Sequence, residues 1–170
     1  GHAKLDIPRT VGAAAGKFSP LDVGQASHLG FHEYLLDLSA TRYLELTGSH
    51  DPIPADQTLL LMVGRGTSDP TALAELRQFV RLRARRTPVG GVKTCFLAMA
   101  EPLLERALTE AAGSTFRRVV VQPHLLFHGE LLLKLREQVE QIARRYPDKQ
   151  WLLTAHLGPH PLLLDAMVDL

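Results

Sequence analysis

This chain has very little cysteine, no long apolar run and almost no net charge. Cys95 is the only cysteine in 170 residues, which excludes an internal disulfide and any all-cysteine zinc or iron–sulfur site within the chain. The 19 lysines and arginines are balanced by 18 aspartates and glutamates, so the chain lacks the basic field of a nucleic-acid-binding domain. No apolar run has the length of a membrane span, and the first residues lack the pattern of a signal peptide. The default expectation is a reducing, cytoplasmic setting.

The most informative stretch covers residues 58–70, T-L-L-L-M-V-G-R-G-T-S-D-P. Its apolar run at 59–63 has the length of a buried strand, and the two glycines that follow allow a sharp turn. Asp69 suits a helix N-cap, and Pro70 suits a first helical position. The stretch therefore predicts a strand, a tight loop and a helix start. In an open α/β sheet such a junction lies at the carboxyl edge of the strands, where ligands bind.

The predicted loop suits an anionic group. A helix start offers N–H groups and a partial positive charge, and Arg65 adds a full charge. The pattern is not a dinucleotide fingerprint, which needs glycine where Asp69 stands, and it lacks the G-K-[S/T] ending of a P-loop. A structural turn without a ligand is the alternative.

Strand and helix patterns alternate from residue 58 to the end of the chain. Strands are expected at 59–63, 92–97, 116–121 and 151–155, and helices at 70–86, 101–113, 131–146 and 160–170. This alternation is typical of right-handed βαβ units. The predicted fold class is therefore α/β, a three-layer αβα domain with a four-stranded parallel sheet.

The first 57 residues follow a different pattern. Residues 1–27 have no sustained periodicity and are expected to be mostly irregular, residues 31–46 predict an amphipathic helix, and residues 47–57 indicate a linker with two prolines. Ten residues from His28, H-L-G-F-H-E-Y-L-L-D, recur from His156 as H-L-G-P-H-P-L-L-L-D with seven identities. Residues 28–57 are therefore interpreted as the end of an earlier half, and residues 58–170 as one α/β domain. A helix-capping loop used twice is the alternative.

The order of four motifs resembles a known family. V-G-R-G-T-S-D-P at the first strand, C-F-L-A-M-A-E-P from Cys95, V-V-V-Q-P-H-L-L-F-H-G from Val119 and H-L-G-P-H-P from His156 are similar to the CbiX type of sirohydrochlorin cobaltochelatase, which is related to ferrochelatases. The resemblance covers residues 58–170 and the H-L-G-x-H helix before them. Long members of that family carry two halves in tandem, and this chain is similar to a second, chelatase-like half with the tail of the first.

The resemblance implies insertion of a divalent metal into sirohydrochlorin on the way to cobalamin, with cobalt foremost and iron or nickel as variants. The metal is then a substrate, and no organic cofactor is expected. The implied partners are the tetrapyrrole and a second chelatase-like half, in the same chain or as a dimer.

Two departures from the family pattern put catalysis by this half in question. Catalytic halves have histidine between the two glycines, where this chain has Arg65. They have a second histidine past the glycine of the third-strand loop, where Gly129 is followed here by Glu130 and leucines. The alternative function is a noncatalytic structural half, or one that binds the tetrapyrrole or the metal.

Candidate substrate-binding residues lie in the first loop. They are Gly64, Arg65, Gly66 and Thr67. Arg65 would clamp a carboxylate of the tetrapyrrole. Alternatively, Arg65 is solvated or forms a salt bridge with the other half.

Candidate metal ligands follow the third strand. His124 and His128 lie four residues apart, and Glu130 is a third ligand or the catalytic proton acceptor. The alternative is that the histidines are loop residues satisfied by backbone carbonyls.

The remaining candidates are expected to be structural. His156 and His160 are spaced for a metal, but their recurrence as His28 and His32 favours capping and packing. Cys95 is expected to be a buried core thiol. The arginines at the end of the helix at 70–86 are expected to face solvent; they are Arg81, Arg83, Arg85 and Arg86.

Overall fold

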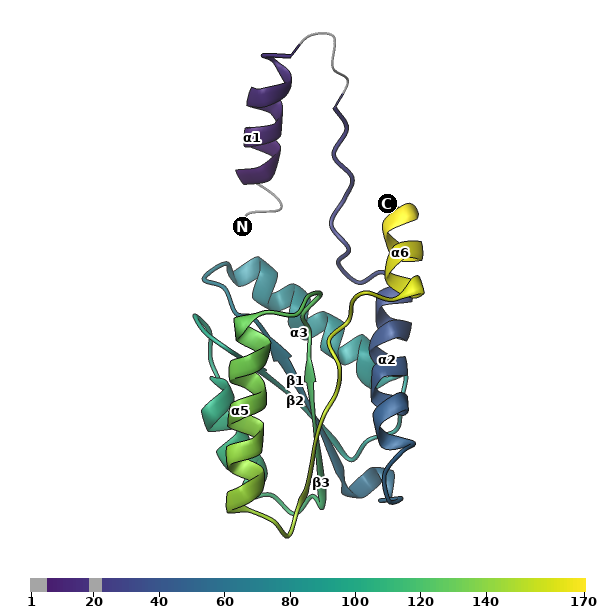
Figure 1. Ribbon diagram of the computed structural model, residues 1–170, viewed down its shortest axis with the longest axis vertical. Helices are drawn as coiled ribbons and strands as arrows, with labels where there is room; N and C mark the ends of the chain where they lie inside the picture. The colour runs from purple at the N-terminus through teal and green to yellow at the C-terminus, as the bar shows by residue number, and fades with distance from the viewer. Residues whose placement is uncertain (1–5, 19–22) are drawn as a thin grey trace.

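A four-stranded parallel sheet forms the centre of the computed structural model, which describes residues 6–18 and 23–170 (Figure 1). The strands are β1 (Thr58–Gly64), β2 (Gly91–Phe96), β3 (Arg118–Pro123) and β4 (Gln150–Leu153). Their order in the sheet is β2-β1-β3-β4. The predicted α/β class with a four-stranded parallel sheet is confirmed.

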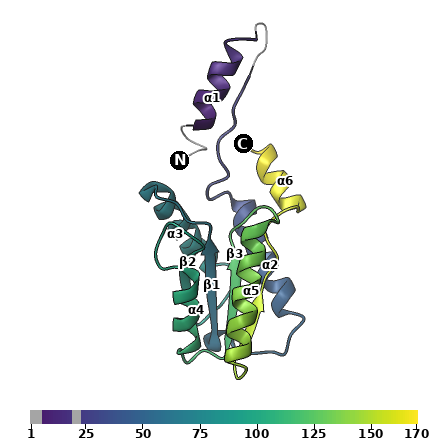
Figure 2. The ribbon, with the colours of Figure 1, turned by 60° about the vertical axis from the view of Figure 1, so that its left-hand side comes forward.

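Helices cover both faces of the sheet. These helices are α2 (Glu33–Thr47), α3 (Pro70–Ala84), α4 (Leu104–Ala112), α5 (Glu130–Arg145) and α6 (Pro161–Val168). Helix α1 (Asp6–Ala15) lies away from the sheet (Figure 1), and a short 3-10 helix, η1, precedes β1 at Ala55–Gln57. Figure 2 shows α4 and α5 together on one side of the sheet. In the part of the chain that is described, no helix is long and apolar enough to cross a membrane.

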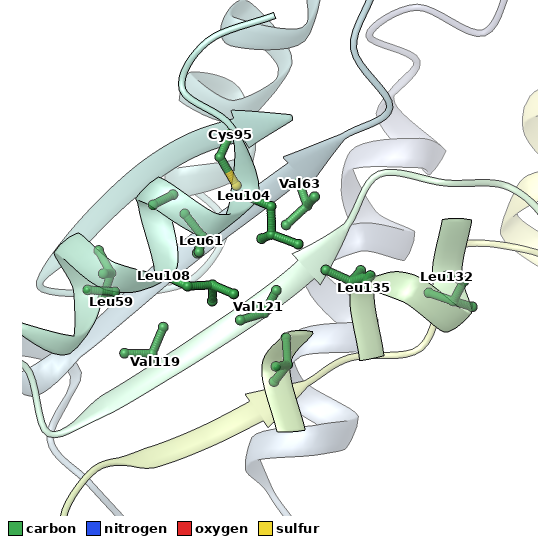
Figure 3. Close-up of a cluster of buried hydrophobic side chains, with 13 residues drawn as sticks. Leu59, Leu61, Val63, Cys95, Leu104, Leu108, Val119, Val121, Leu132 and Leu135 are labelled. Atoms are coloured by element: carbon green, nitrogen blue, oxygen red, sulfur yellow. The ribbon is translucent and has the colours of Figure 1, made fainter. Parts of the chain in front are cut away.

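The alternation of side chains along β1 builds two hydrophobic cores. Leu59, Leu61 and Val63 belong to the core under α4 and α5, which Figure 3 shows with Leu104 and Leu135. Leu60 and Met62 belong to the other core, under α2, α3 and α6. Because both faces are covered, β1 is buried along its whole length.

Cys95 lies in the first of these cores, as expected. Its side chain is fully buried, and burial raises the pKa of the thiol to about 12. The thiol therefore stays protonated and unreactive at neutral pH.

Every element expected after residue 58 is present, with shifted ends. The largest shift is at α4, which begins at Leu104 and not at residue 101. The reason is that Phe96 N–H donates to the Pro102 carbonyl at 3.0 Å, which holds residues 101–103 against the end of β2. The expectation for the first 27 residues is wrong over Asp6–Ala15, because α1 forms there with none of its side chains buried. Residues 1–5 and 19–22 of that segment lie outside the described residues.

The expectation that all four arginines face solvent is wrong for Arg83. Its side chain is 0% exposed. The guanidinium donates to Ser39 Oγ at 3.0 Å, to Thr87 Oγ1 at 2.7 Å and to Gln122 Oε1 at 3.4 Å, and it lies 5.6 Å from the centre of the Tyr43 ring. Burial lowers its pKa to about 10, so the group stays charged at neutral pH among neutral partners. Arg83 thereby joins α2, α3 and β3.

The second histidine of each H-L-G-x-H copy caps a helix in the same way. His32 Nδ1 accepts from Tyr34 N–H at 3.3 Å at the start of α2, and His160 Nδ1 accepts from Leu162 N–H at 3.2 Å at the start of α6. The predicted capping role is confirmed for His160 and its counterpart His32, whereas the His156 side chain caps no helix within the described residues. Helices α2 and α6 lie side by side (Figure 1) and contact each other.

Candidate functional site

The site is built at the carboxyl end of β1, where the course of the chain reverses. The chain passes from β1 to β2 on one side and later returns to β3 on the other. Such a switch point leaves a crevice outside the strand ends. The neighbouring loops are tied to β1 there. Leu97 N–H donates to the Gly64 carbonyl at 3.0 Å, and His124 N–H donates to the Val63 carbonyl at 2.8 Å.

A cavity of about 310 Å³ lies at this switch point. Its lining comes from several parts of the chain: the loop after β1 with the first turns of α3, the first H-L-G copy, the end of β2 at Phe96, and the loops after β3 and β4. The predicted substrate-binding residues Gly64, Arg65, Gly66 and Thr67 all line it, and so does His124. The structure therefore brings five of the seven predicted site residues to one cavity.

A larger cavity, of about 490 Å³, lies between α4 and α5 and is lined by residues such as Glu105, Gln138 and Arg145. This cavity lies away from the carboxyl ends of the strands, and none of the loops that follow those ends lines it. We therefore take the cavity at β1 as the candidate site.

The two glycines shape the loop after β1. Gly66 has φ +92°, and a Cβ atom at that position would lie 1.6 Å from the Ala98 carbonyl oxygen. A Cβ on Gly64 would lie 2.3 Å from a methyl group of Leu76. Gly66 therefore needs to be glycine so that the loop can approach the loop after β2, whereas a side chain at residue 64 would require Leu76 to move.

The start of α3 is less available to an anion than the sequence suggests. Asp69 caps the helix as predicted, and its Oδ1 accepts from the N–H groups of Thr71 at 2.9 Å and Ala72 at 3.4 Å. Thr67 Oγ1 accepts from the Asp69 N–H at 3.1 Å. Within the described residues, the N–H groups of Gly66 and Thr67 donate no hydrogen bond. The positive groups left for an anion are these two N–H groups and Arg65.

Arg65 is exposed at the edge of the cavity. Among the described residues its guanidinium makes no ion pair, unlike Arg86, which binds Asp37 at 2.8 Å and also binds Glu33. Its charge is therefore available to a carboxylate outside the chain.

Sequence reasoning missed the contribution of the first H-L-G copy. His28, Leu29, Gly30 and Phe31 line the cavity, and His28 Nε2 lies 3.5 Å from Glu75 Oε2 on α3. The long-range repeat could have predicted this contribution. It relates residues 28–37 to residues 156–165, which follow β4 and therefore lie at the carboxyl edge of the sheet.

His124 turns inward. Its ring centre lies 4.3 Å from that of Phe79, and its buried Nδ1 has no hydrogen-bond partner within the described residues. Burial lowers the pKa of His124 to about 4. The imidazole is therefore neutral at pH 7.

The predicted group of His124, His128 and Glu130 is not assembled. His128 is exposed, and its ring centre lies 6.3 Å from that of His156. Glu130 is exposed at the first position of α5, and neither it nor His128 lines the cavity. In residues 6–18 and 23–170, no three histidine, cysteine or acidic side chains are grouped so that they could hold a metal ion. The roles predicted for these three residues stay predictions.

Comparison with known proteins gives one family. The model of the CbiX family matches residues 59–170. Sirohydrochlorin cobaltochelatase of Priestia megaterium is 31% identical over 163 residues, which are 96% of this chain and 53% of the relative. Sirohydrochlorin ferrochelatase of the same organism is 30% identical over 159 residues, 94% of this chain and 58% of the relative. This chain thus spans little more than half the length of these relatives.

The fold is also similar to solved structures. SirB from Bacillus subtilis with Fe³⁺ has a TM-score of 0.84 at 23% identity, covering 99% of this chain and 64% of that one. SirB from B. subtilis subspecies spizizenii in complex with cobalt has a TM-score of 0.76 at 22% identity, covering 99% of this chain and 61% of that one. At this identity the similarity establishes the fold alone.

Proposed function

Since this chain belongs to the CbiX family, we propose that it acts in the insertion of a divalent metal into sirohydrochlorin. Within that reaction the chain binds the tetrapyrrole at the cavity beside β1. The observation that carries the proposal is the position of Arg65, an exposed cation without an ion pair among the described residues, at the edge of a cavity at the switch point of the sheet.

The chemistry of the cavity suits one edge of a carboxylated macrocycle. Leu73, Leu76 and Phe96 supply an apolar wall, and Arg65 supplies a charged hydrogen-bond donor for a carboxylate at the rim. The N–H groups of Gly66 and Thr67 add neutral donors. A volume of about 310 Å³ is at the low end for a ligand pocket, about 300–1,000 Å³. The cavity therefore holds an edge of the macrocycle and leaves its centre accessible to the metal.

Two pyrrole protons must leave as a metal enters. Glu130 is the acceptor predicted from the sequence, and it is exposed at the start of α5. Glu75 is the carboxylate that lines the cavity, beside His28. We propose a carboxylate as the acceptor, because a carboxylate is ionised at neutral pH.

Cobalt is the metal we propose, with iron as the competitor to be tested beside it. The relatives named for cobalt and for iron are 31% and 30% identical to this chain, so identity does not separate the two metals.

A second candidate is a half that binds the tetrapyrrole without inserting the metal. Arg65 stands where the family resemblance calls for histidine, and the described residues contain no group of three metal ligands. In this case a second chelatase-like half, in the same chain or as a dimer, supplies the ligands for insertion.

The test is a titration of sirohydrochlorin, followed by absorbance and fluorescence, with the chain and with Arg65→Gln. Arg81→Gln is the matched control, because Arg81 is an exposed arginine on α3 away from the cavity. We expect saturable binding that Arg65→Gln weakens about tenfold, equivalent to ~1.4 kcal/mol, and that Arg81→Gln leaves unchanged. Equal affinity of the chain and Arg65→Gln would overturn the proposed role of Arg65.

The same samples, given cobalt or iron, separate the two candidates. Faster appearance of the metallated product with the chain than without it supports insertion by this half. Binding without acceleration supports the second candidate.

A further inference from the structure

His128 and His156 form a pair that the proposed function does not use. His128 lies in the loop between β3 and α5, and His156 lies in the loop between β4 and α6. The two strands are neighbours in the sheet, so both loops leave the same edge. The ring centres are 6.3 Å apart, and the ring planes are inclined at 68°.

Hydrogen bonds between the two loops hold the pair in register. Leu157 N–H donates to the Leu125 carbonyl at 2.9 Å, and Gly158 N–H donates to the Leu126 carbonyl at 3.0 Å. A Cβ on Gly158 would lie 2.7 Å from the Leu126 carbonyl oxygen, so this approach needs glycine. The relative position of the two loop backbones that carry the imidazoles is therefore fixed.

Within the described residues, the rings of His128 and His156 have no hydrogen-bond or ion-pair partner. Most of the other described histidines have one. His28 contacts Glu75, His50 contacts the Leu46 carbonyl, and His32 and His160 cap helices. His124 also has no partner, but it is packed against Phe79. The nitrogens of His128 and His156 are thus available to an external ligand.

The surroundings of His156 favour its neutral imidazole. Burial, the neighbouring His128 and Arg42 lower the pKa of His156, which favours the neutral form of the ring that binds a metal. Arg42 donates from Nε to the His156 carbonyl at 3.1 Å, and its charge is offset by the ion pair with Glu45 at 3.1 Å.

The separation is close to the upper limit for two imidazoles that share one ion. A metal–nitrogen bond of about 2.0–2.1 Å places each ring centre about 3.2 Å from the metal. Two ring centres are then about 5 Å apart when the nitrogen–metal–nitrogen angle is tetrahedral, and at most about 6.4 Å apart when that angle is straight. The observed 6.3 Å is inside this limit, and a rotation of the exposed His128 side chain shortens it.

We propose that His128 and His156 form a binding site for one divalent transition metal of the cobalt, nickel or zinc kind, with water in the remaining positions. The site lies just outside the cavity, because Leu126 and Leu157 line the cavity while the two histidines do not. It pairs His128 with His156, and not with His124. The proposal does not depend on binding of a tetrapyrrole.

The test is a calorimetric titration of the chain with Co²⁺ alone at pH 7, with the visible absorption of cobalt recorded in parallel. The variants are His128→Ala and His156→Asn, the second chosen because a polar side chain suits a half-buried position. The matched controls are His124→Ala and His50→Ala, and circular dichroism checks that each variant is folded.

We expect one Co²⁺ per chain, lost in His128→Ala and in His156→Asn and kept in both controls. No binding to the folded parent chain, or unchanged binding in either His128→Ala or His156→Asn, would overturn the proposal. Loss in His124→Ala would also overturn it, because it would indicate the pair expected from sequence spacing. Because no tetrapyrrole is present, either result leaves the proposed role of Arg65 to its own test.

Discussion

The environment of His124 predicts a specific loss of stability in acid. Partial burial of its imidazole at the wall of the cavity lowers the pKa from 6.5 to about 4, with the ring beside Phe79 and Nδ1 unpartnered among the described residues. Between these two pH values the unfolded chain takes up a proton that the folded chain does not. The contribution of the neutral ring to the free energy of unfolding is therefore complete above pH 6.5 and is lost as the pH falls toward 4.

The magnitude follows from the size of the shift. Each pKa unit corresponds to about 1.4 kcal/mol, so the full effect is about 3 kcal/mol, of which about 2 kcal/mol has been lost at pH 5. His124→Phe removes the titrating group and the unpartnered nitrogen while keeping the ring against Phe79. We expect the free energy of unfolding of this variant to fall about 2 kcal/mol less than that of the parent between pH 7 and pH 5.

The assay is urea denaturation at pH 7 and pH 5, followed by circular dichroism. His50→Phe serves as the control, because His50 is exposed. It should keep the pH dependence of the parent. Parallel pH profiles for the parent and His124→Phe would refute the reasoning, because they would mean that His124 accepts a proton freely in the folded protein.

Three further predictions concern other parts of the fold. Arg83→Lys removes the guanidinium that bonds Ser39, Thr87 and Gln122, and we expect a loss of about 2–4 kcal/mol in urea denaturation; unchanged stability would contradict it. Gly66→Ala should cost at least about 3 kcal/mol, because its Cβ would lie 1.6 Å from the Ala98 carbonyl oxygen; Gly12→Ala in α1, with open space around it, is the control. Met99→Gly should raise stability by about 1 kcal/mol, because Met99 has φ +61° and is 68% exposed; a decrease would show that its side chain is needed.

The parts of the fold that the sequence predicted are those encoded locally. The apolar run of β1, the two glycines after it and the Asp69 cap act over a few residues, so each could be recognised from its neighbours. The position of the cavity followed from the same stretch, because parallel strands all end at one edge of the sheet.

The parts that were missed depend on contacts between distant residues. Arg83 belongs to a run of arginines at a helix end, and nothing near it in sequence indicates that Ser39 and Gln122 will surround its guanidinium. The four-residue spacing of His124 and His128 predicted that these two side chains would share a metal. The hydrogen bonds between the loops after β3 and β4 bring His128 instead to His156, 28 positions further along the chain.

Binding of the tetrapyrrole at the carboxyl end of β1 can be mapped by the backbone amide NMR shifts that change on addition of sirohydrochlorin. We expect the largest shift changes at Gly64, Gly66, Thr67 and the neighbouring turns of α3. Shifts confined to the cavity between α4 and α5, at residues such as Glu105 and Arg145, would contradict it.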